Sequence, residues 1–249
     1  MPLEHPFPST IERAAALNHR FNGKTAQDVV TYALNAPEIG RVALVSSFGA
    51  ESVVLLHMFA RIDRTAPVLF IDTEMLFAET LDYQKEVARA LGLRNVQTIT
   101  PDRDAVFLRD NSNRMHIHNP AGCCALRKTE PLQRALESFD GWLTGRKRFQ
   151  GGKRSELNFF EADGDSRIKG NPLAFWEPKD IAAYVAEHKL PKHPLVAKGF
   201  ASLGCAPCTS RVVEGEDPRA GRWRGQAKTE CGLHFENGQA IPAGRQETI

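Results

Sequence analysis

The sequence predicts an α/β fold in which a mainly parallel sheet carries helices on both faces. Two observations support this prediction: short apolar runs occur at residues 41–47, 66–72 and 95–100, and amphipathic stretches alternate with them. Ligands of such sheets bind at the carboxyl ends of the strands. We therefore expect residues 46–52 and 72–74, which follow two of the runs, to border a binding site.

Local signals along the chain predict the individual elements. Ser9 and Thr10 ahead of Glu12 are typical of a helix N-terminus, Gly49 marks a turn between strand and helix, and Pro178 marks a helix start. In chain order, we expect helices over 9–21 and 25–35, a strand over 41–47, a buried helix over 53–59, a strand over 66–72, a helix over 76–91, a strand over 95–100, a helix over 120–139, a strand over 141–145 and a helix over 180–188.

The composition excludes several classes of protein. The chain has 249 residues, of which 42% are hydrophobic and 25% charged, as in globular proteins and unlike disordered or fibrous ones. Its 32 Lys and Arg residues against 30 Asp and Glu give a net charge of +2, too balanced for a protein that neutralises a long nucleic-acid backbone. A small anionic ligand is compatible with this charge.

No internal repeat or linker divides the chain, so we expect one domain over residues 1–235, with its core at about 40–235. Prolines and glycines are frequent after residue 190, which predicts a loop-rich region, and residues 236–249 are expected to form a mobile tail. The N-terminus lacks a secretory signal and no apolar run is long enough to cross a membrane, so we expect a cytoplasmic protein. The sequence leaves a homo-oligomer open.

Four of the five cysteines form two pairs. Cys123 and Cys124 are adjacent, and Cys205 and Cys208 have the spacing that lets two thiolates hold one metal centre across a turn. Adjacent cysteines reach one centre only from a helix or turn, which the helical pattern after Pro120 makes available. Four thiolates suit zinc or an iron–sulfur cluster; two inert buried cysteines beside an unrelated redox pair are the alternative.

The fifth cysteine, Cys231, lies in the polar stretch KTECGLH at 228–234. Nearby cations, Lys228, Arg219 and Arg222 among them, would favour its thiolate and make it a good nucleophile. A buried structural thiol would usually lie in an apolar run. We therefore interpret Cys231 as a reactive cysteine.

Basic residues gather in three places: Arg127 and Lys128, residues 145–154, and residues 219–224. Guanidinium and ammonium groups pair with phosphate and sulfate oxygens. Solvated surface is the alternative for each cluster alone, but their positions beside strand ends and cysteines favour an anion site. The turn SSFGAES at 46–52 joins strand to helix as anion-binding loops do, although it has neither the Walker nor the dinucleotide-binding pattern.

Over roughly residues 40–235 these segments resemble the assimilatory sulfonucleotide reductases, the family of adenylyl-sulfate (APS) and phosphoadenylyl-sulfate (PAPS) reductases. The matching motifs are SSFGAES at 46–52, IDT at 71–73, CCALRKTEPL at 123–132, GCAPCT at 204–209, EDPRAGRW at 216–223 and KTECGLH at 228–234. Two segments depart from the family: Glu74 stands where glycine is common, and GRKRFQGGKR at 145–154 follows the glycine–arginine segment only loosely. The resemblance implies an adenine nucleotide alpha-hydrolase-like fold related to the PP-loop ATP pyrophosphatases.

The resemblance also implies roles for the matching residues, with Cys231 as the nucleophile. The residues implied to hold one 4Fe–4S cluster per chain are Cys123, Cys124, Cys205 and Cys208. The residues implied to contact the substrate are Ser46, Ser47 and Gly49 in the loop beside the nucleotide and Lys128, Arg219 and Arg222 facing the phosphosulfate.

The reaction implied is thioredoxin-dependent reduction of APS to sulfite and AMP through a Cys231 S-sulfonate, within sulfate assimilation and cysteine biosynthesis. If four cysteines hold a cluster, no second thiol remains to release sulfite, so an external dithiol, thioredoxin, is required. The cysteine pairs favour APS, because family members restricted to PAPS usually lack them.

Three alternative functions remain open at this point. The closest is a PAPS reductase with the same chemistry. An ATP-using PP-loop enzyme is more distant, because SSFGAES lacks the SGGxDS form typical of that class. A zinc-stabilised nucleotide-binding module without catalysis would leave KTECGLH unexplained.

Overall fold

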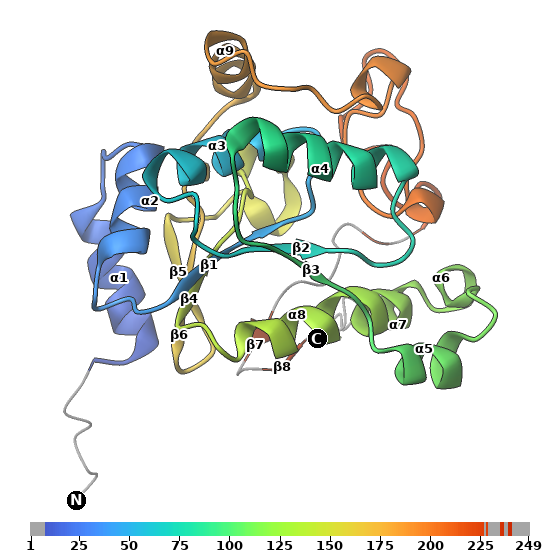
Figure 1. The fold of residues 1–249 in the computed structure, drawn as a ribbon, viewed down its shortest axis with the longest axis horizontal. Helices are drawn as coiled ribbons and strands as arrows, with labels where there is room; N and C mark the ends of the chain where they lie inside the picture. Colours follow the sequence, from blue (N-terminus) through green and yellow to red (C-terminus); the bar gives the residue numbers. More distant parts are fainter. Residues whose placement is uncertain (1–7, 227, 229–234, 237–238, 241–249) are drawn as a thin grey trace, which may run out of the picture.

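The computed structural model describes residues 8–226, 228, 235–236 and 239–240. Six strands form one sheet in the order β3-β2-β1-β4-β6-β5 (Figure 1). Their bounds are Val42–Ser46 for β1, Val68–Ile71 for β2, Val96–Ile99 for β3, Gly141–Leu143 for β4, Phe160–Asp163 for β5 and Arg167–Gly170 for β6. Neighbouring strands run parallel except β5, which pairs antiparallel with β6 at the edge of the sheet. The predicted mainly parallel α/β sheet is therefore confirmed.

The helices predicted over 9–21, 25–35, 53–59, 76–91 and 180–188 are present with ends within a few residues of the expected ones. Their bounds are Thr10–Arg20 for α1, Ala26–Asn35 for α2, Ser52–Ile62 for α3, Ala78–Leu91 for α4, Arg103–Asp110 for α5, Met115–His118 for α6, Pro120–Cys124 for α7, Glu130–Leu136 for α8 and Pro178–Glu187 for α9. At the start of α1, the Ser9 hydroxyl accepts the Glu12 N–H at 3.3 Å, and the Glu12 carboxylate accepts the Ser9 N–H at 2.8 Å. This reciprocal cap is the one that the Ser9 and Glu12 spacing predicts.

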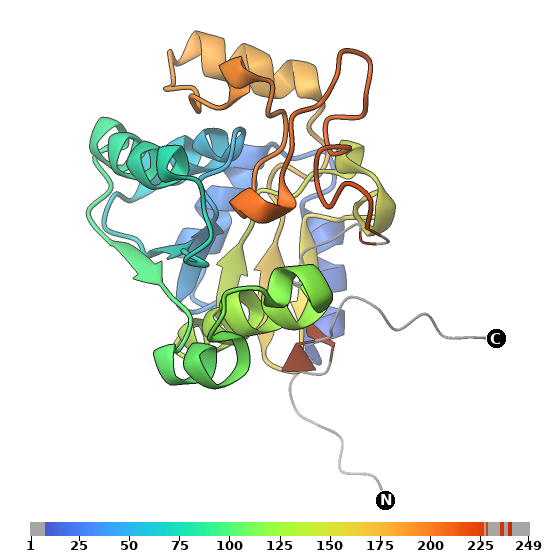
Figure 2. The same cartoon turned by 90° about the vertical axis from the view of Figure 1, so that its right-hand side faces the viewer.

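Helices lie on both faces of the sheet (Figures 1 and 2), and a cluster of buried apolar side chains packs on each face. Leu44 of β1 and Phe70 of β2 pack with α2, α3 and α4 on one face, whereas Val45 and Leu69 pack against α8 on the other. Because successive side chains of a strand point to opposite faces, a strand covered on both sides is apolar throughout. The central strands β1 and β2 are accordingly buried along their whole length.

The structure differs from the sequence prediction in three places. The helix predicted over 120–139 consists of α7, a π-helical turn at Ala125–Thr129, and α8, which ends at Leu136. The antiparallel pair β5–β6 and the short helices α5 and α6 were not predicted. After α9, the described residues contain two short 3-10 turns, Val196–Lys198 and Ala206–Cys208, and the two-residue strands β7 (Phe235–Glu236) and β8 (Gln239–Ala240), which pair antiparallel.

Two further expectations concern the chain as a whole. Within the residues that the structure describes, no helix is long and apolar enough to pass through a bilayer. The expected end of the domain at residue 235 and the expected tail over 236–249 fall in a stretch of which four residues, 235–236 and 239–240, are described. That boundary stays a prediction.

Candidate active site

A cleft of about 220 Å³ opens at the carboxyl ends of β1 and β4, against the loop segment 201–223. It is lined by all six residues for which the sequence predicts substrate contact: Ser46, Ser47, Gly49, Lys128, Arg219 and Arg222. The indole side chains of Trp142 and Trp223 add apolar wall. The cleft therefore combines aromatic surface with several cations, which suits an anionic ligand that carries a planar group.

The turn between β1 and α3 has a fixed conformation. Phe48 has a φ of 47° and is fully buried, with its ring centre 5.3 Å from that of Phe70. The Ser46 hydroxyl accepts the Phe48 N–H at 3.1 Å, and the Ser52 hydroxyl donates to the Gly49 carbonyl at 2.6 Å. A left-handed backbone at phenylalanine persists only when its surroundings hold it. The turn therefore presents the N-terminus of α3 to the cleft in one defined shape, with the helix dipole favouring an anion there.

Three of the cations that line the cleft come from two segments that lie far apart in the sequence. Arg222 donates from Nη1 to the Leu203 carbonyl at 2.7 Å, and its guanidinium lies 4.5 Å from the centre of the Trp223 ring. The guanidinium of Arg219 lies 5.9 Å from the same ring. Lys128 comes from the π-helical turn before α8. The fold thus brings together the positive charges that the two basic motifs contribute.

Arg127, the neighbour of Lys128, does not line this cleft. Its guanidinium is 2% exposed and lies 3.0 Å from the Asp110 carboxylate; it also donates to Asn113 Oδ1 at 2.6 Å and to the Thr73 carbonyl at 3.3 Å. Burial alone would raise the pKa of Asp110, but the Met115 N–H and Arg127 outweigh burial and lower it. Arg127 is a buried connection between α5, the β2 loop and the π-helical turn.

Most cations of the segment 145–154 contact their own chain. Lys147 is buried and donates to Glu51 Oε2 at 2.7 Å, while Arg146 pairs with Glu161. Burial lowers the pKa of Lys147, and Glu51 opposes that shift. Arg148 donates to the Leu157 carbonyl at 2.6 Å. The Glu51–Lys147 pair joins the start of α3 to the opposite wall of the cleft.

A second, smaller pocket of about 40 Å³ adjoins the cleft. It is lined by the thiols of both cysteine pairs, Cys123, Cys124, Cys205 and Cys208. The pKa of the Cys123 thiol is raised to about 12, mainly by burial, and the neighbouring Cys124 and Cys205 contribute in the same direction. Among the described residues, however, no three Cys, His, Asp or Glu side chains are already grouped as closely as metal ligands are. The donor set of four thiols around one pocket fits a metal centre, while the side-chain positions are not those of a closed site.

Local structure explains how each cysteine pair reaches this pocket. The Asn119 side chain accepts the Gly122 N–H at 2.9 Å and caps α7, which carries Cys123 and Cys124 on consecutive helical positions. A Cβ on Gly122 would lie 2.5 Å from Asn119 Nδ2, so glycine is needed for this close cap. The adjacent pair therefore lies in a helix, as its sequence context predicts.

The second pair lies on the 3-10 turn Ala206–Cys208. The Ala206 N–H donates to the Met75 carbonyl at 2.7 Å, and the Trp223 N–H donates to the Cys208 carbonyl at 3.0 Å. The Thr73 hydroxyl lies 3.2 Å from Cys205 Sγ. The turn is therefore tied to both the β2 loop and the segment that carries Arg219 and Arg222.

Cys231, the predicted nucleophile, and its neighbour His234 lie outside the described residues. Lys228, three positions before Cys231, is described: its ammonium donates to Cys124 Sγ and to the Pro120 carbonyl, both at 3.1 Å. Lys228 itself is therefore held beside the cysteine pocket.

The family described as "Phosphoadenosine phosphosulfate reductase domain" matches residues 41–211. The chain belongs to this reductase family. It is 45% identical to the adenosine 5′-phosphosulfate reductase of Chelativorans sp., over 95% of this chain and 96% of that one. It is 52% identical to the adenosine 5′-phosphosulfate reductase of Mesorhizobium japonicum, over 78% and 76% of the two chains.

Solved structures agree with this assignment. The phosphoadenylyl-sulfate reductase of Candida auris, solved as a phosphate complex, superposes with a TM-score of 0.68 at 26% identity, covering 81% of this chain and 97% of that one. FMN adenylyltransferase of Candida glabrata has a TM-score of 0.55 at 16% identity, covering 87% of this chain and 72% of that one, and shares the fold alone. The expected adenine nucleotide alpha-hydrolase-like fold is confirmed.

Glu74 stands where the resemblance implies glycine, and its backbone conformation is one that favours glycine. Glu74 adopts a φ of 58°, a left-handed conformation that glycine reaches without strain. Its N–H donates to Asp72 Oδ1 at 2.8 Å, and its carboxylate lies 3.6 Å from Arg127 Nη1. These two contacts help to hold the glutamate in the turn.

Proposed function

We propose that this chain reduces adenylyl sulfate to sulfite and AMP, with thioredoxin as the external reductant. The observation that carries the proposal is the shared wall of the two cavities, because Ser47, Lys128 and Arg222 line both the cleft and the cysteine pocket. A nucleotide whose phosphosulfate lies at that wall would place its sulfur beside the elements that carry the cysteines. The two relatives named adenosine 5′-phosphosulfate reductases support APS as the substrate.

In this proposal the cleft binds the substrate by charge and by shape. Ser46, Ser47 and Gly49 lie at the start of α3, where backbone N–H groups and the helix dipole favour a phosphate. The positive charges assigned to the phosphosulfate are those of Lys128, Arg219 and Arg222. Guanidinium and ammonium groups stabilise charge on phosphate and sulfate oxygens most strongly where water is excluded.

The four cysteines around the second pocket are proposed to hold a 4Fe–4S cluster. The donor set is the one such a cluster requires, and both pairs lie on short helical turns that face one pocket. When bound, the cluster supplies a local electrostatic field and a crosslink between α7 and the turn at 206–208. The electrons for sulfate reduction come from thiols.

The proposed reaction runs through Cys231. Its thiolate attacks the sulfate sulfur of APS, a sulfur–sulfur bond forms, and the bond from that sulfur to the bridging oxygen breaks, so that AMP leaves with the electron pair. One thiolate of thioredoxin then attacks Cys231 Sγ and releases sulfite with the electrons of the sulfur–sulfur bond. The second thiol of thioredoxin resolves the mixed disulfide and regenerates the Cys231 thiolate, leaving thioredoxin oxidised.

The test is to trap the covalent intermediate. Wild-type protein incubated with APS and no dithiol should gain the mass of one sulfonate on the peptide that contains Cys231, and reduced thioredoxin should remove it while releasing sulfite. Cys231→Ser should bind APS and gain no such mass. An adduct on Cys205 or Cys208, or sulfite release by Cys231→Ser, would overturn the assignment of the nucleophile.

A further inference from the structure

One lysine on strand β6 lies in the wall of the cleft. Lys169 is 6% exposed and lines the cleft, and its ammonium lies 4.6 Å from the centre of the Trp142 ring on the neighbouring strand β4. With the residues that the structure describes, this ammonium makes no hydrogen bond and no ion pair within 4.0 Å. A buried ammonium that lacks a carboxylate partner is unusual, because burial of an unpaired charge is strongly unfavourable.

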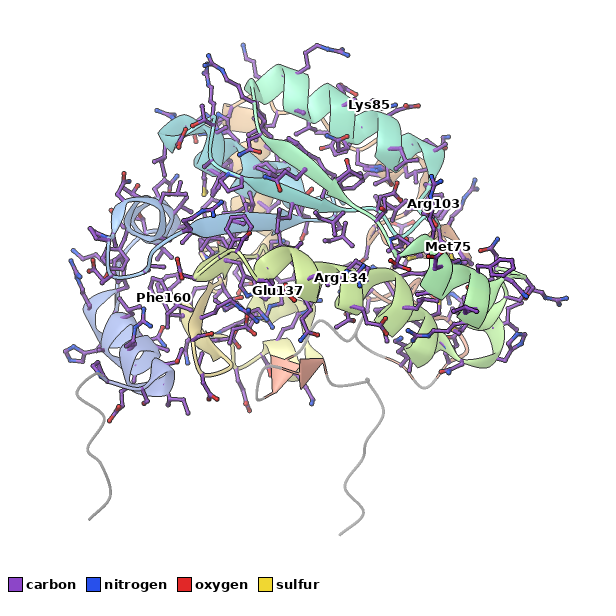
Figure 3. All side chains as sticks on the ribbon, turned by 60° about the horizontal axis from the view of Figure 1, so that its bottom comes forward. Met75, Lys85, Arg103, Arg134, Glu137 and Phe160 are labelled. Atoms are coloured by element: carbon purple, nitrogen blue, oxygen red, sulfur yellow. The ribbon has the colours of Figure 1, made fainter. Side chains whose placement is uncertain are left out.

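The nearest carboxylates are engaged by other donors. Glu161, which is paired with Lys169 in the β5–β6 register, accepts from Arg146 and from Asn171 Nδ2, the latter at 2.8 Å. Asp163, two positions along β5, accepts from Trp142 Nε1 at 2.8 Å and from Arg167 Nε at 2.9 Å. Figure 3 labels Phe160 at the start of this edge strand. The fold therefore uses both acids for other contacts and leaves the Lys169 ammonium facing the cleft.

We propose that Lys169 binds an anionic oxygen of the nucleotide, so that the ligand supplies the counter-ion that the fold does not. This inference rests on the proposed function, because it takes the anionic nucleotide as the occupant of the cleft. The group contacted is the phosphate or the sulfate of adenylyl sulfate, which share the required oxyanion chemistry. Lys169 is then a binding residue in addition to Lys128, Arg219 and Arg222.

A change in proton binding distinguishes this role from simple packing on Trp142. The pKa of Lys169 is lowered to about 7, because burial and then Arg146 lower it by more than Glu161 and Asp163 raise it. The other groups that act on the ammonium are Arg154 of the 152–154 turn and the Trp142 ring. An oxyanion at the ammonium restores its charged form, so binding takes up a fraction of a proton, near one half at pH 7. The phosphosulfate itself does not titrate near neutral pH.

The measurement is calorimetric titration of full-length Cys231→Ser protein with APS, in buffers of different ionisation enthalpy at the same pH. The dependence of the apparent enthalpy on buffer gives the number of protons taken up. We expect uptake near pH 7 and an affinity that falls about tenfold between pH 6 and pH 8, as neutralisation of the free lysine around pH 7 requires. Adding Lys169→Met should abolish that uptake and weaken APS binding about ten- to hundredfold.

Two further variants separate charge from structure. Lys169→Arg keeps the cation and should keep most of the affinity while losing the proton uptake. Lys85→Met removes an exposed lysine of α4 (Figure 3) that does not line the cleft, and should change neither the affinity nor the proton uptake. The same titrations with AMP and with adenosine identify the group that Lys169 contacts. If Lys169→Met weakens binding of AMP and APS but not of adenosine, the contact is to the phosphate. If it weakens binding of APS alone, the contact is to the sulfate.

The outcomes also separate this inference from the proposed function. If the Cys231→Ser protein binds neither APS nor AMP, the proposed function is wrong. If it binds APS but Lys169→Met leaves both affinity and proton uptake unchanged, the inference alone is wrong, and the proton belongs to another group such as the buried Lys147. Equal weakening of adenosine, AMP and APS by Lys169→Met would show a structural role and would also overturn the inference.

Discussion

The guanidinium of Arg127 lies 3.0 Å from the carboxylate of Asp110, and both side chains are almost completely buried. Arg127 immediately precedes Lys128 and follows the cysteine pair of α7 by a few residues. The ion pair therefore fixes the π-helical turn against α5 at the point where the chain contributes one cation to the cleft and two thiols to the adjoining pocket.

Breaking this pair should destabilise the protein strongly. Arg127→Met leaves the Asp110 carboxylate buried without its guanidinium, and we expect the free energy of unfolding to fall by about 3–5 kcal/mol. Arg109→Met is the matched control, because it removes an exposed pair with Glu130 at 2.8 Å and should cost less than about 1 kcal/mol. Urea unfolding of both variants measures the difference. Similar losses in the two would show that burial of the Asp110 pair carries no special weight.

The sequence predicts the parts of the site that depend on strand ends, and fails where burial decides the role of a side chain. Residues 46–52 could be placed at the cleft because a parallel sheet brings its carboxyl ends together. Arg127 and Lys128 could not be separated, since neighbours on a helical turn point in different directions and the sequence does not say which one faces the interior.

The antiparallel pair β5–β6 was not predicted because its polar residues, too, are placed by contacts that the sequence does not show. The β5 sequence FEAD carries two acids, which is typical of an exposed loop. In the structure the two carboxylates accept hydrogen bonds from Arg146, Trp142 and Arg167. Because buried polar groups are tolerated when they are hydrogen-bonded, the acids can lie on a covered strand. Lys169 gave no sequence signal for the same reason: its place in the cleft wall depends on pairing between β5 and β6.

A buried histidine should make the protein less stable in mild acid. His193 is 1% exposed, its Nδ1 accepts the Leu195 N–H at 3.2 Å, and burial lowers its pKa to about 4 from 6.5, with Glu79 opposing. The folded state favours the neutral ring, so this stability is complete above about pH 6.5 and is lost as the pH falls towards 4. Between about pH 7.5 and pH 5 the loss should be on the order of 2 kcal/mol.

Urea unfolding of wild type and His193→Gln at these two pH values isolates the effect. Other groups titrate in both proteins, so the difference between the proteins reports His193. We expect the variant to lose less stability on acidification than wild type does. Equal losses would contradict the assignment of a buried neutral histidine.

The metal content tests the four cysteines as one set. Anaerobically purified protein should contain about four iron atoms per chain and absorb broadly in the visible range. Cys208→Ser should lose the cluster, because the turn Ala206–Cys208 then offers one thiol instead of two. Cys231→Ser makes the same chemical change outside the set and should retain iron. Stoichiometric zinc in place of iron, or full iron in Cys208→Ser, would overturn the cluster assignment.

The preference for APS or PAPS depends on whether the 3′-phosphate of PAPS can pair with basic side chains of the protein. Four basic residues of the 145–154 segment contact groups of their own chain: Arg146, Lys147, Arg148 and Arg154. Lys147 is the clearest case, since its ammonium is buried against Glu51 at 2.7 Å. A 3′-phosphate that lies against these four residues would have to displace such contacts, which costs on the order of 1–3 kcal/mol.

We therefore expect kcat/KM for APS to exceed that for PAPS by at least about tenfold. Parallel steady-state assays with reduced thioredoxin measure the ratio. Glu51→Gln tests the physical reason, because it removes the carboxylate that holds Lys147 and should narrow the preference by improving use of PAPS relative to APS. The contacts of Arg146 with Glu161 and of Arg148 with the Leu157 carbonyl do not involve Glu51, so a residual preference for APS should persist in this variant. Equal or better use of PAPS by the wild-type protein would instead assign it to the PAPS-reducing members of the family.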